Sequence, residues 1–410
     1  MNIEEALKKL NALHQIEAVA PGWEASQRAL PEGGPAFLQP EQIIANRAWC
    51  DFGTEVDAAL LHTAERIRTD ETLRRFAWHC AWRLYDAPEA SWFADWPTLE
   101  SVLGEDAGIF YLLVGISFAL QVRAFHQAMH IPEAITQATL QQPRCFADNY
   151  AKMHSGKLGI PRSQLGWLRH YTREKYFRLG RFEYWLKPHY EHGVHVYRHT
   201  TNGRVLAFAP SGARLDDDGY ALDPENTAGW QTTLAITPDT ITGYPISPRG
   251  YVLPDPVSIP RPEWQSALQP GDYVLDMHIP AGGGLSFETW SASMRQAAAF
   301  FPAHFPDMLP KAFVCLSWMY SPDLEKLLPP ESNLVRHLSE MYLFPVPGAY
   351  LWFIFMQDEF DPATAPRDTS LQRAVLAYLE QGHAWHDGGM FLLMEDLDKL
   401  GTGYYRTTAE

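Results

Sequence analysis

The sequence predicts an α+β protein, with an all-helical N-terminal domain followed by a mixed α/β C-terminal domain around a central sheet. Three observations predict it. Over residues 1–174, apolar residues recur at the three- and four-residue spacing of buried helix faces. Over residues 175–410, short alternating runs typical of strands take over. Within this second part, an apolar strand, a glycine-rich loop and a helix follow one another at 272–301.

The first 174 residues contain four long helical patterns. We expect helices at 57–85, 107–129, 132–154 and 161–174. Asp70 is a plausible N-cap that divides the first of them into two. Pro132 and Pro161 stand at helix starts, where a missing N–H group costs least. The apolar stretch 108–122 is shorter than the roughly 20 residues that span a bilayer, so we expect a buried helix there.

The second part of the chain contains strand signals of unequal strength. The Asn202-Gly203 turn between alternating runs predicts a hairpin. Residues 210–270 are rich in Pro, Gly, Asp and Thr. We expect a loop-rich insertion that wraps the sheet and holds only short strands, at 234–237 and 251–253. The remaining expected elements are strands at 272–279, 312–318, 350–356 and 389–395, and helices at 286–301, 323–328, 332–341 and 370–382.

Composition narrows the classes of function. The 410 residues carry a formal net charge of −16, which disfavours a nucleic-acid partner or an anionic membrane surface. The four cysteines show no C-x-x-C pairing, which argues against a disulfide framework and fits a reducing compartment. The first residues are acidic where a signal peptide would be basic. We therefore expect a soluble cytoplasmic protein.

The strand–loop–helix unit at 272–301 is the best candidate for a binding site. Gly282, Gly283 and Gly284 remove side-chain bulk and permit positive φ. Ser286 is placed to cap the helix that follows. A helix N-terminus offers unpaired N–H groups and the positive end of a dipole, so this unit suits a phosphate or pyrophosphate. A simple strand-to-helix turn is the alternative reading.

Candidate catalytic groups lie on the neighbouring strands. Asp276 and His278 are two residues apart on one strand, so their side chains share a face, and a carboxylate beside an imidazole is a sensible general base. Ser317, at the end of the next strand, could donate to an oxyanion or a substrate. Each could equally be structural. Tyr342 and Arg336 are further candidates to face the same cleft, and spacing does not choose between them.

A dense histidine cluster offers a competing site. It comprises His189, His192, His195 and His199. Imidazoles at this density can bind zinc, which would suit a metal-dependent hydrolase. Only His195 and His199 would share a face of a strand, and no cysteine or ordered carboxylate completes the set. We therefore expect no physiological metal.

Over a longer span the sequence resembles a known family. The segments similar to the family's C-terminal domain are 274–280 (VLDMHIP), the glycine loop, 299–306 (AFFPAHFP), 311–318 (KAFVCLSW) and 328–335 (LPPESNLV). Those similar to its N-terminal domain are 159–161 (GIP), 166–169 (GWLR) and 177–182 (FRLGRF). They resemble a two-domain family of bacterial proteins named as acyltransferases. In this family a helical N-acyltransferase N-terminal domain precedes a GNAT-like C-terminal domain. The resemblance covers about three quarters of the chain.

The resemblance implies a function and a set of site residues. It implies an N-acyltransferase that uses acyl-CoA or acetyl-CoA as co-substrate and acylates the amine of a small-molecule acceptor. The residues that would hold the cofactor are Ile279, Ala281, Gly282, Gly283, Gly284, Leu285 and Ser286. Two features depart from the family's loop pattern, His278 at its first position and Ala281 at its fourth. They favour the rival reading, a non-catalytic GNAT-like module that binds a small molecule or a partner. The oligomeric state stays open.

Overall fold

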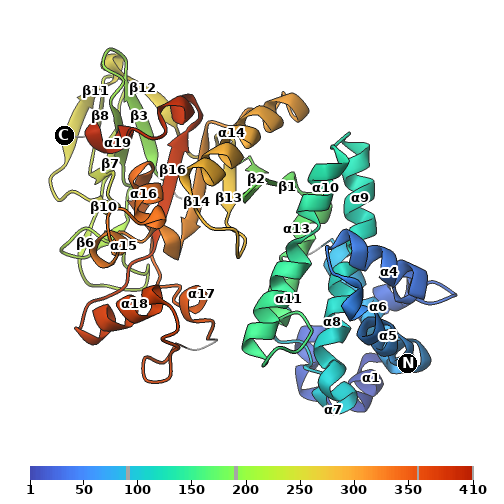
Figure 1. Ribbon diagram of the computed structural model, residues 1–410. Coiled ribbons are helices and arrows are strands. Elements are labelled where there is room, and N and C mark those ends of the chain that lie inside the picture. Colours follow the sequence, from blue (N-terminus) through green and yellow to red (C-terminus); the bar gives the residue numbers. More distant parts are fainter. Residues whose placement is uncertain (89–92, 189–192, 358–359, 409–410) are drawn as a thin grey trace. The chain divides into compact units, whose positions relative to one another are not determined.

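Helices make up the first part of the chain, and sheets with flanking helices make up the second, which confirms the α+β prediction. The computed structural model describes residues 1–88, 93–188, 193–357 and 360–408 (Figure 1). Contacts divide the chain into two units, Met1–Leu179 and Gly180–Glu410. The boundary that we place after residue 174 from sequence stays a prediction.

The first unit is helical apart from its last strand. Its elements are α1 (Ile3–Lys9), α2 (Ile16–Val19), α3 (Trp23–Arg28), α4 (Pro40–Trp49), α5 (Asp57–Thr69), α6 (Glu71–Tyr85), α7 (Glu100–Leu103), α8 (Ala107–Ile116), α9 (Ala119–Ala128), α10 (Glu133–Thr139), α11 (Gln142–Met153), α12 (Arg162–Leu165), α13 (Leu168–Arg173) and β1 (Tyr176–Leu179). Asp70 caps α6 by accepting from the N–H groups of Thr72 and Leu73, which confirms the predicted division.

Two sequence expectations for this unit have different outcomes. The helix expected at 132–154 is wrong as a single element, because α10 ends at Thr139 and α11 begins at Gln142 with Pro143 in its first turn. The apolar stretch is a buried helix as expected over α8, where every residue is buried. Most of its remainder lies in the separate helix α9, where Leu120 is exposed. By length and composition Glu100–Ala128 could cross a membrane, but 72% of its most apolar window is buried inside the protein.

The second unit is built on a central sheet. Its strands follow the order β2 (Phe182–Lys187), β13 (Val274–His278), β14 (Ala312–Ser317), β16 (Gly388–Leu393) and β15 (Tyr342–Pro345). Only β13 and β14 are parallel to each other, and the other pairs are antiparallel. The helices of this unit are α14 (Phe287–His304), α15 (Leu324–Leu327), α16 (Asn333–Ser339), α17 (Trp352–Phe355), α18 (Ser370–Glu380) and α19 (Tyr404–Thr407).

The long helix α14 lies against one face of this sheet. Ser293, near its middle, accepts a hydrogen bond from the Phe182 N–H group at 3.1 Å and shares another with the Tyr184 hydroxyl at 2.9 Å. Trp290 and Met294, on the same helix, are buried. Because side chains alternate along a strand, the face that carries Tyr184 is the one that α14 covers. Residues one position away along β2 face the opposite side.

Residues 210–270 hold short strands joined by longer connecting segments. The short strands expected at 234–237 and 251–253 are present as Leu234–Ile236 and Tyr251–Val252, whereas the other strands of this segment were not expected. A five-stranded sheet has the order β10 (Tyr251–Val252), β9 (Pro245–Ser247), β4 (Val205–Phe208), β3 (His195–His199) and β12 (Trp264–Leu268). A three-stranded sheet has the order β11 (Val257–Pro260), β8 (Thr240–Gly243) and β7 (Leu234–Ile236). A two-stranded sheet pairs β5 (Arg214–Leu215) with β6 (Trp230–Gln231). Most of these strands are two to five residues long, too short for a period-2 pattern to emerge. The predicted Asn202-Gly203 hairpin is confirmed as β3–β4.

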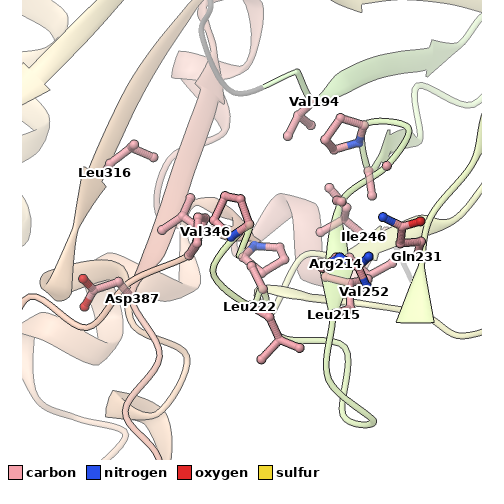
Figure 2. Close-up of a pocket in the computed structure, with 18 of the residues that line it drawn as sticks. Val194, Arg214, Leu215, Leu222, Gln231, Ile246, Val252, Leu316, Val346 and Asp387 are labelled. Atoms are coloured by element: carbon pink, nitrogen blue, oxygen red, sulfur yellow. The ribbon is translucent and has the colours of Figure 1, made fainter. Parts of the chain in front are cut away.

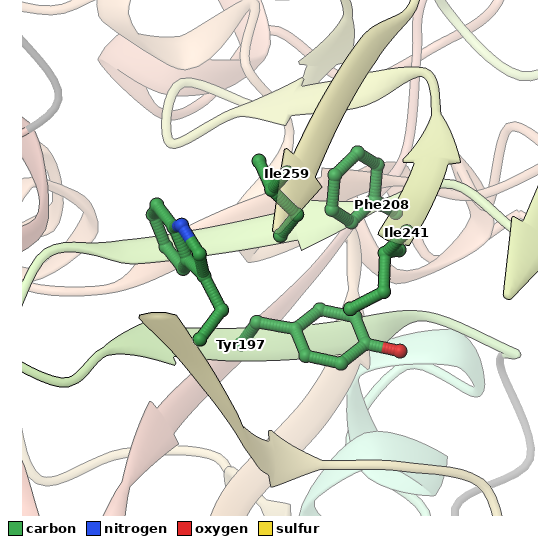
Figure 3. Close-up of a cluster of buried hydrophobic side chains, with 5 residues drawn as sticks. Tyr197, Phe208, Ile241 and Ile259 are labelled. Atoms are coloured by element: carbon green, nitrogen blue, oxygen red, sulfur yellow. The ribbon is translucent and has the colours of Figure 1, made fainter. Parts of the chain in front are cut away.

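One apolar cluster holds the two larger inserted sheets together. Figure 3 shows its five side chains, each from a different strand: Tyr197, Phe208, Ile241, Ile259 and Trp264. All five are buried, and the Tyr197 and Phe208 rings meet edge to face at 6.0 Å. The insertion therefore has a core of its own.

The segment after β15 departs from the sequence prediction. The strand expected at 350–356 is wrong, because α17 (Trp352–Phe355) occupies this stretch and β15 (Tyr342–Pro345) supplies the edge strand instead. The aromatic run resembles a strand by composition alone. However, Pro347 and Gly348, which has a φ of 108°, turn the chain away from the sheet before it. Tyr350 and Phe353 are left exposed.

Candidate functional site

The parallel strands β13 and β14 pair over only part of their length. Their register runs from Val274 opposite Ala312 to Asp276 opposite Val314 and stops there. Beyond this point β13 still pairs with β2 as far as His278, and β14 still pairs with β16 as far as Ser317. The two strands therefore separate at their carboxyl ends. We call this the strand splay: past Asp276 and Val314 the two peptide edges no longer pair with each other.

The glycine loop follows directly from the splay. Gly282, Gly283 and Gly284 have φ values of 82°, 74° and 61°, a region that favours glycine, as predicted. No atom lies within 4 Å of where a Cβ would stand at Gly282 or Gly284, so the backbone there is open to approach. The Arg181 guanidinium fixes the loop by donating from Nε to the Gly284 oxygen at 2.7 Å and from Nη1 to the Pro280 oxygen at 2.8 Å.

A capped helix start completes the loop. The Ser286 hydroxyl accepts from the Thr289 N–H group at 3.4 Å, which confirms Ser286 as the N-cap of α14. The first turn of an α-helix retains N–H groups without helical partners, and the eighteen residues of α14 align their dipoles behind them. With Arg181 alongside, the loop offers a positive environment for an anion. Sequence reasoning missed Arg181, because only strand pairing brings it to the loop.

Asp276 and His278 lie together as predicted, on the sheet face opposite α14. The His278 Nε2 atom is 3.7 Å from the Asp276 Oδ2 atom, and the Lys187 Nζ atom is 3.3 Å from the same oxygen. Burial opposes ionisation of Asp276, but His278 and then Lys187 outweigh it and hold the pKa of that carboxyl below its usual range. The two side chains remain 19% and 30% exposed, so a substrate could reach them.

Ser317 is not brought together with this pair. Asp276 is in register with Val314, so alternation places Ser317 on the opposite face of the sheet. Its hydroxyl accepts from the Met319 N–H group at 3.2 Å and begins a short 3-10 turn, Trp318–Tyr320. Because the Ser317 hydroxyl acts as an acceptor in this bond, its hydrogen can donate to another group. The catalytic roles of all three residues stay predictions.

The alternatives Tyr342 and Arg336 differ in position. Tyr342 is buried and serves the fold: its hydroxyl accepts from the Ala207 N–H group at 3.3 Å and donates to the Ile246 oxygen at 2.6 Å, joining the central sheet to the inserted one. Arg336 is an exposed residue of α16. On the same helix His337 is buried, and burial followed by the nearby Arg181 charge lowers its pKa to about 3. His337 is therefore neutral at ordinary pH.

An elongated cavity of about 460 Å³ adjoins the end of β14. Figure 2 shows Leu316 and Asp387 on one side of it and Arg214, Gln231 and Val252 on the other. The wall comes from β14, from the chain after β15 and from residues 209–252 of the insertion. Its apolar side chains include Val194, Leu215, Leu222, Ile246, Val252, Leu316 and Val346. Sequence analysis missed this cavity, because its wall consists of segments that it took for loops.

The histidine cluster lies partly outside the described residues. His189 and His192 fall in the stretch that the structure leaves out. His199 has Nε2 3.7 Å from the Glu263 carboxylate, and its Nδ1 accepts from the Thr201 N–H group at 3.2 Å. Across the part of the chain that the structure describes, no three His, Cys, Asp or Glu side chains gather as metal ligands would. The hydrolase reading gains no support from these positions.

The fold of this chain is similar to that of solved acyltransferase structures. The chain resembles an acyltransferase in complex with CoA and 10C-teicoplanin, with TM-score 0.64, 18% identity and coverage of 96% of this chain and 100% of that one. A complex of an acyltransferase with decanoyl-CoA and teicoplanin gives TM-score 0.63, 19% identity and coverage of 96% and 100%. A complex of an acyltransferase with decanoyl-CoA gives TM-score 0.54 and 19% identity, with coverage of 96% of this chain and 99% of that one. At these identities the likeness shows the fold. No curated protein sequence matches.

Two family models match in sequence. The model for the N-acyltransferase N-terminal domain matches residues 48–173, and the model for the GNAT-like C-terminal domain matches residues 176–392. The second match alone spans more than half of the chain. The two matches follow each other in the order that the sequence resemblance implies. The chain therefore belongs to the family of proteins with a GNAT-like C-terminal domain, here preceded by an N-acyltransferase N-terminal domain.

Proposed function

We propose that this protein is an acyl-CoA-dependent N-acyltransferase that acylates an amine of a small-molecule acceptor. The observation that carries the proposal is the strand splay, which opens directly into a positively charged glycine loop and the capped start of α14. The family matches and the CoA or decanoyl-CoA in three structures of similar fold support it.

The proposed cofactor site extends from the splay to the helix. The pantetheine arm would lie between the peptide edges of β13 and β14, beside Ile279. The pyrophosphate would lie on Ala281 and the three glycines, with Leu285 and Ser286 leading into the first turn of α14. Arg181 would supply a nearby positive charge while it holds the loop in shape. The open backbone at Gly282 and Gly284 fits a bulky anion.

His278 is the proposed general base, and Asp276 positions it. The amine nitrogen of the acceptor attacks the thioester carbonyl carbon, a C–N bond forms and the C–S bond breaks. His278 takes the proton that the amine loses, and the leaving thiolate gains a proton from an acid that is not identified. The Asp276 carboxylate favours the protonated imidazole that results, at a distance of 3.7 Å. Atoms and charge balance without a metal ion.

Ser317 is the proposed donor to the thioester oxygen. Its hydroxyl accepts from the Met319 N–H group, which orients the oxygen and leaves the hydrogen free to donate. Ser317 lies at the carboxyl end of β14, past the point where the pairing with β13 ends, and it lines the cavity. A donor there would stabilise charge that develops on the carbonyl oxygen.

The type of acceptor and the cellular compartment are also proposals. The net charge of −16 favours a cationic amine acceptor and disfavours a nucleic-acid or membrane partner. Cysteine usage fits a reducing compartment such as the cytoplasm. A bacterial source is what the family resemblance implies. Among the similar structures, two hold teicoplanin or an acylated teicoplanin, which makes a large small-molecule acceptor a reasonable first choice for a screen.

Thermal unfolding with and without CoA tests the proposal. A ligand at about 100 times its Kd should stabilise the wild type by about 2.7 kcal/mol. Gly283→Asp places a carboxylate in the loop and should abolish the shift. Gly271→Asp is the control, because Gly271 also has positive φ but lies before β13, outside the loop. A Cβ at Gly271 would meet no atom within 4 Å, whereas at Gly283 it would meet the Arg181 side chain at 3.4 Å.

Three outcomes are informative. A shift that survives in Gly271→Asp and is lost in Gly283→Asp supports the CoA site. An unchanged shift in Gly283→Asp would move the site away from the glycine loop. If CoA and acetyl-CoA shift nothing, the transferase proposal fails, and the rival reading, a GNAT-like binding module without catalysis, takes its place.

A further inference from the structure

The cavity beside β14 has the character of a site for an apolar chain. Its wall is mostly aliphatic side chains and prolines. Among the lining residues that the structure describes, Asp387 is the one carboxylate, and both of its oxygens are engaged: Oδ2 accepts from the Tyr350 N–H group at 2.7 Å and Oδ1 from the Trp385 indole at 2.9 Å. The other polar side chains of the wall, such as Arg214, Gln231 and Ser317, are few beside its aliphatic side chains and prolines. An alkyl chain therefore gains by burial along most of this wall.

The cavity also has the right position relative to the splay. Leu316 lies two residues beyond Val314 on β14, so it shares the sheet face of Asp276 and His278. Its side chain is 42% exposed although β14 is a central strand, and it lines the cavity. A thioester held at the splay would therefore lie beside the Leu316 end of the cavity. The chain beyond its carbonyl could then extend along the aliphatic wall.

The wall supplied by the insertion is anchored. Asp216 and Tyr220, close to the lining residues Leu215 and Leu222, both meet His386: the Tyr220 ring stacks on the imidazole at 4.1 Å, and His386 Nε2 is 3.7 Å from the Asp216 carboxylate. The Asp323 carboxylate accepts from His386 Nδ1 at 2.9 Å. This segment is therefore held against the rest of the unit, so the cavity is a built feature of the fold.

We propose that this cavity binds the acyl chain of the donor, so that the enzyme uses medium-chain linear acyl-CoA in preference to acetyl-CoA. The proposal rests on the proposed acyltransferase function and adds the chemical class of the group transferred. The chain enters past Leu316 and extends towards Leu222 and Val252, which lie on the insertion.

Equilibrium binding of three ligands tests the chain site separately from the CoA site. CoA and acetyl-CoA report on the glycine loop, and decanoyl-CoA adds the chain. Leu222→Trp fills the cavity from the insertion. Leu253→Trp is the matched control, because Leu253 is an exposed leucine close by in the sequence that does not line the cavity. Leu222→Ala, which adds space, provides a second variant if the larger side chain impairs folding.

In the wild type, decanoyl-CoA should bind at least about tenfold more tightly than acetyl-CoA, since each buried methylene adds to affinity. Leu222→Trp should remove most of this preference and leave CoA and acetyl-CoA within about twofold of wild type, and Leu253→Trp should change neither. Leu222→Ala should keep CoA binding and shift the preference to longer chains. Equal binding of acetyl-CoA and decanoyl-CoA in the wild type would overturn the acyl-chain site, and so would a preference for decanoyl-CoA that Leu222→Trp leaves intact. In either case, binding of CoA would still support the proposed transferase. Failure of all three ligands to bind would overturn the transferase itself.

Discussion

The second unit contains an accessible and an enclosed Asp–His pair, which differ in sequence separation, in distance and in the burial of the carboxylate. Asp276 and His278 lie two residues apart, 3.7 Å from each other and partly exposed. Asp323 and His386 come from distant parts of the chain, 2.9 Å apart, with the carboxylate fully buried. The same two residue types therefore make an accessible pair beside the splay and an enclosed pair beneath the insertion.

The enclosed pair is saturated with hydrogen bonds. Asp323 accepts from His386 Nδ1, from the His386 N–H group at 3.0 Å, from Lys326 at 2.8 Å and from the Tyr378 hydroxyl at 2.9 Å. Burial opposes ionisation of Asp323, but the bonds from His386 and Lys326 outweigh it and hold the pKa of the carboxyl below its usual range. A carboxylate with four donors stabilises a fold and has little capacity left for a substrate. The looser contact beside the splay keeps that capacity.

The largest effect should come from the accessible pair. His278→Gln removes the proposed base, and a lost general base costs about 10²–10⁴-fold in rate. The unfolding temperature and CoA binding should stay close to wild type, because His278 is partly exposed and precedes the residues proposed to hold the cofactor, which begin at Ile279. A steady-state assay of CoA release with an accepted amine checks this. Full activity in His278→Gln would remove the base from the mechanism.

A change in the enclosed pair should lower stability more than it lowers activity. Asp323→Asn leaves Lys326 and His386 without their charged partner in a buried site, and breaking such a contact costs about 3 kcal/mol. Urea unfolding measures the loss. Asp276→Asn serves as the comparison and should cost clearly less stability but more activity. Equal stability losses in the two variants would erase the distinction drawn between the pairs.

Acid should act on stability through both carboxylates. Each has a folded-state pKa below the value of about 3.9 for an unfolded chain, so each contributes stability that is present above that pH and is lost as the pH falls. Urea midpoints between roughly pH 6 and pH 3 should therefore fall more steeply in the wild type than in Asp323→Asn. A variant that loses stability as steeply as the wild type would show that Asp323 carries none of this dependence.

The smallest effect on activity and stability should come from Lys187, which lies beside the accessible pair. Lys187→Met removes a cation 3.3 Å from Asp276, so the pKa of that carboxyl should rise and the acidic limb of the pH–rate profile should move to higher pH. Stability should change by less than about 1 kcal/mol. An unmoved acidic limb in Lys187→Met would mean that Asp276 does not control the protonation state of the base.

The two pairs also show what sequence can and cannot predict. The spacing of Asp276 and His278 along one strand placed them on a common face, and Ser286 marked the start of α14, because both are local features. Nothing local joins Asp323 to His386, 63 residues further along the chain. Lys187 reaches Asp276 only through the pairing of β2 with β13. Contacts of this kind depend on strand order and register.

The cavity escaped prediction for a related reason. Its walls come from strands of two to four residues in the insertion and from the chain after β15. Such short segments bury their side chains through tertiary packing, and their Pro, Gly and Asp content reads as loop. The expected strand over the aromatic run after residue 350 failed similarly, since composition alone does not distinguish a short helix such as α17 from a strand.

Hydrogen–deuterium exchange with and without CoA tests the central claim most directly. The account predicts slower exchange in the backbone of the splay and the glycine loop, from Met277 to Thr289, and at the carboxyl end of β14. It predicts no change at the saturated pair around Asp323. Protection that appears elsewhere in the chain, with none in the loop, would contradict the placement of CoA and with it the mechanism built on His278.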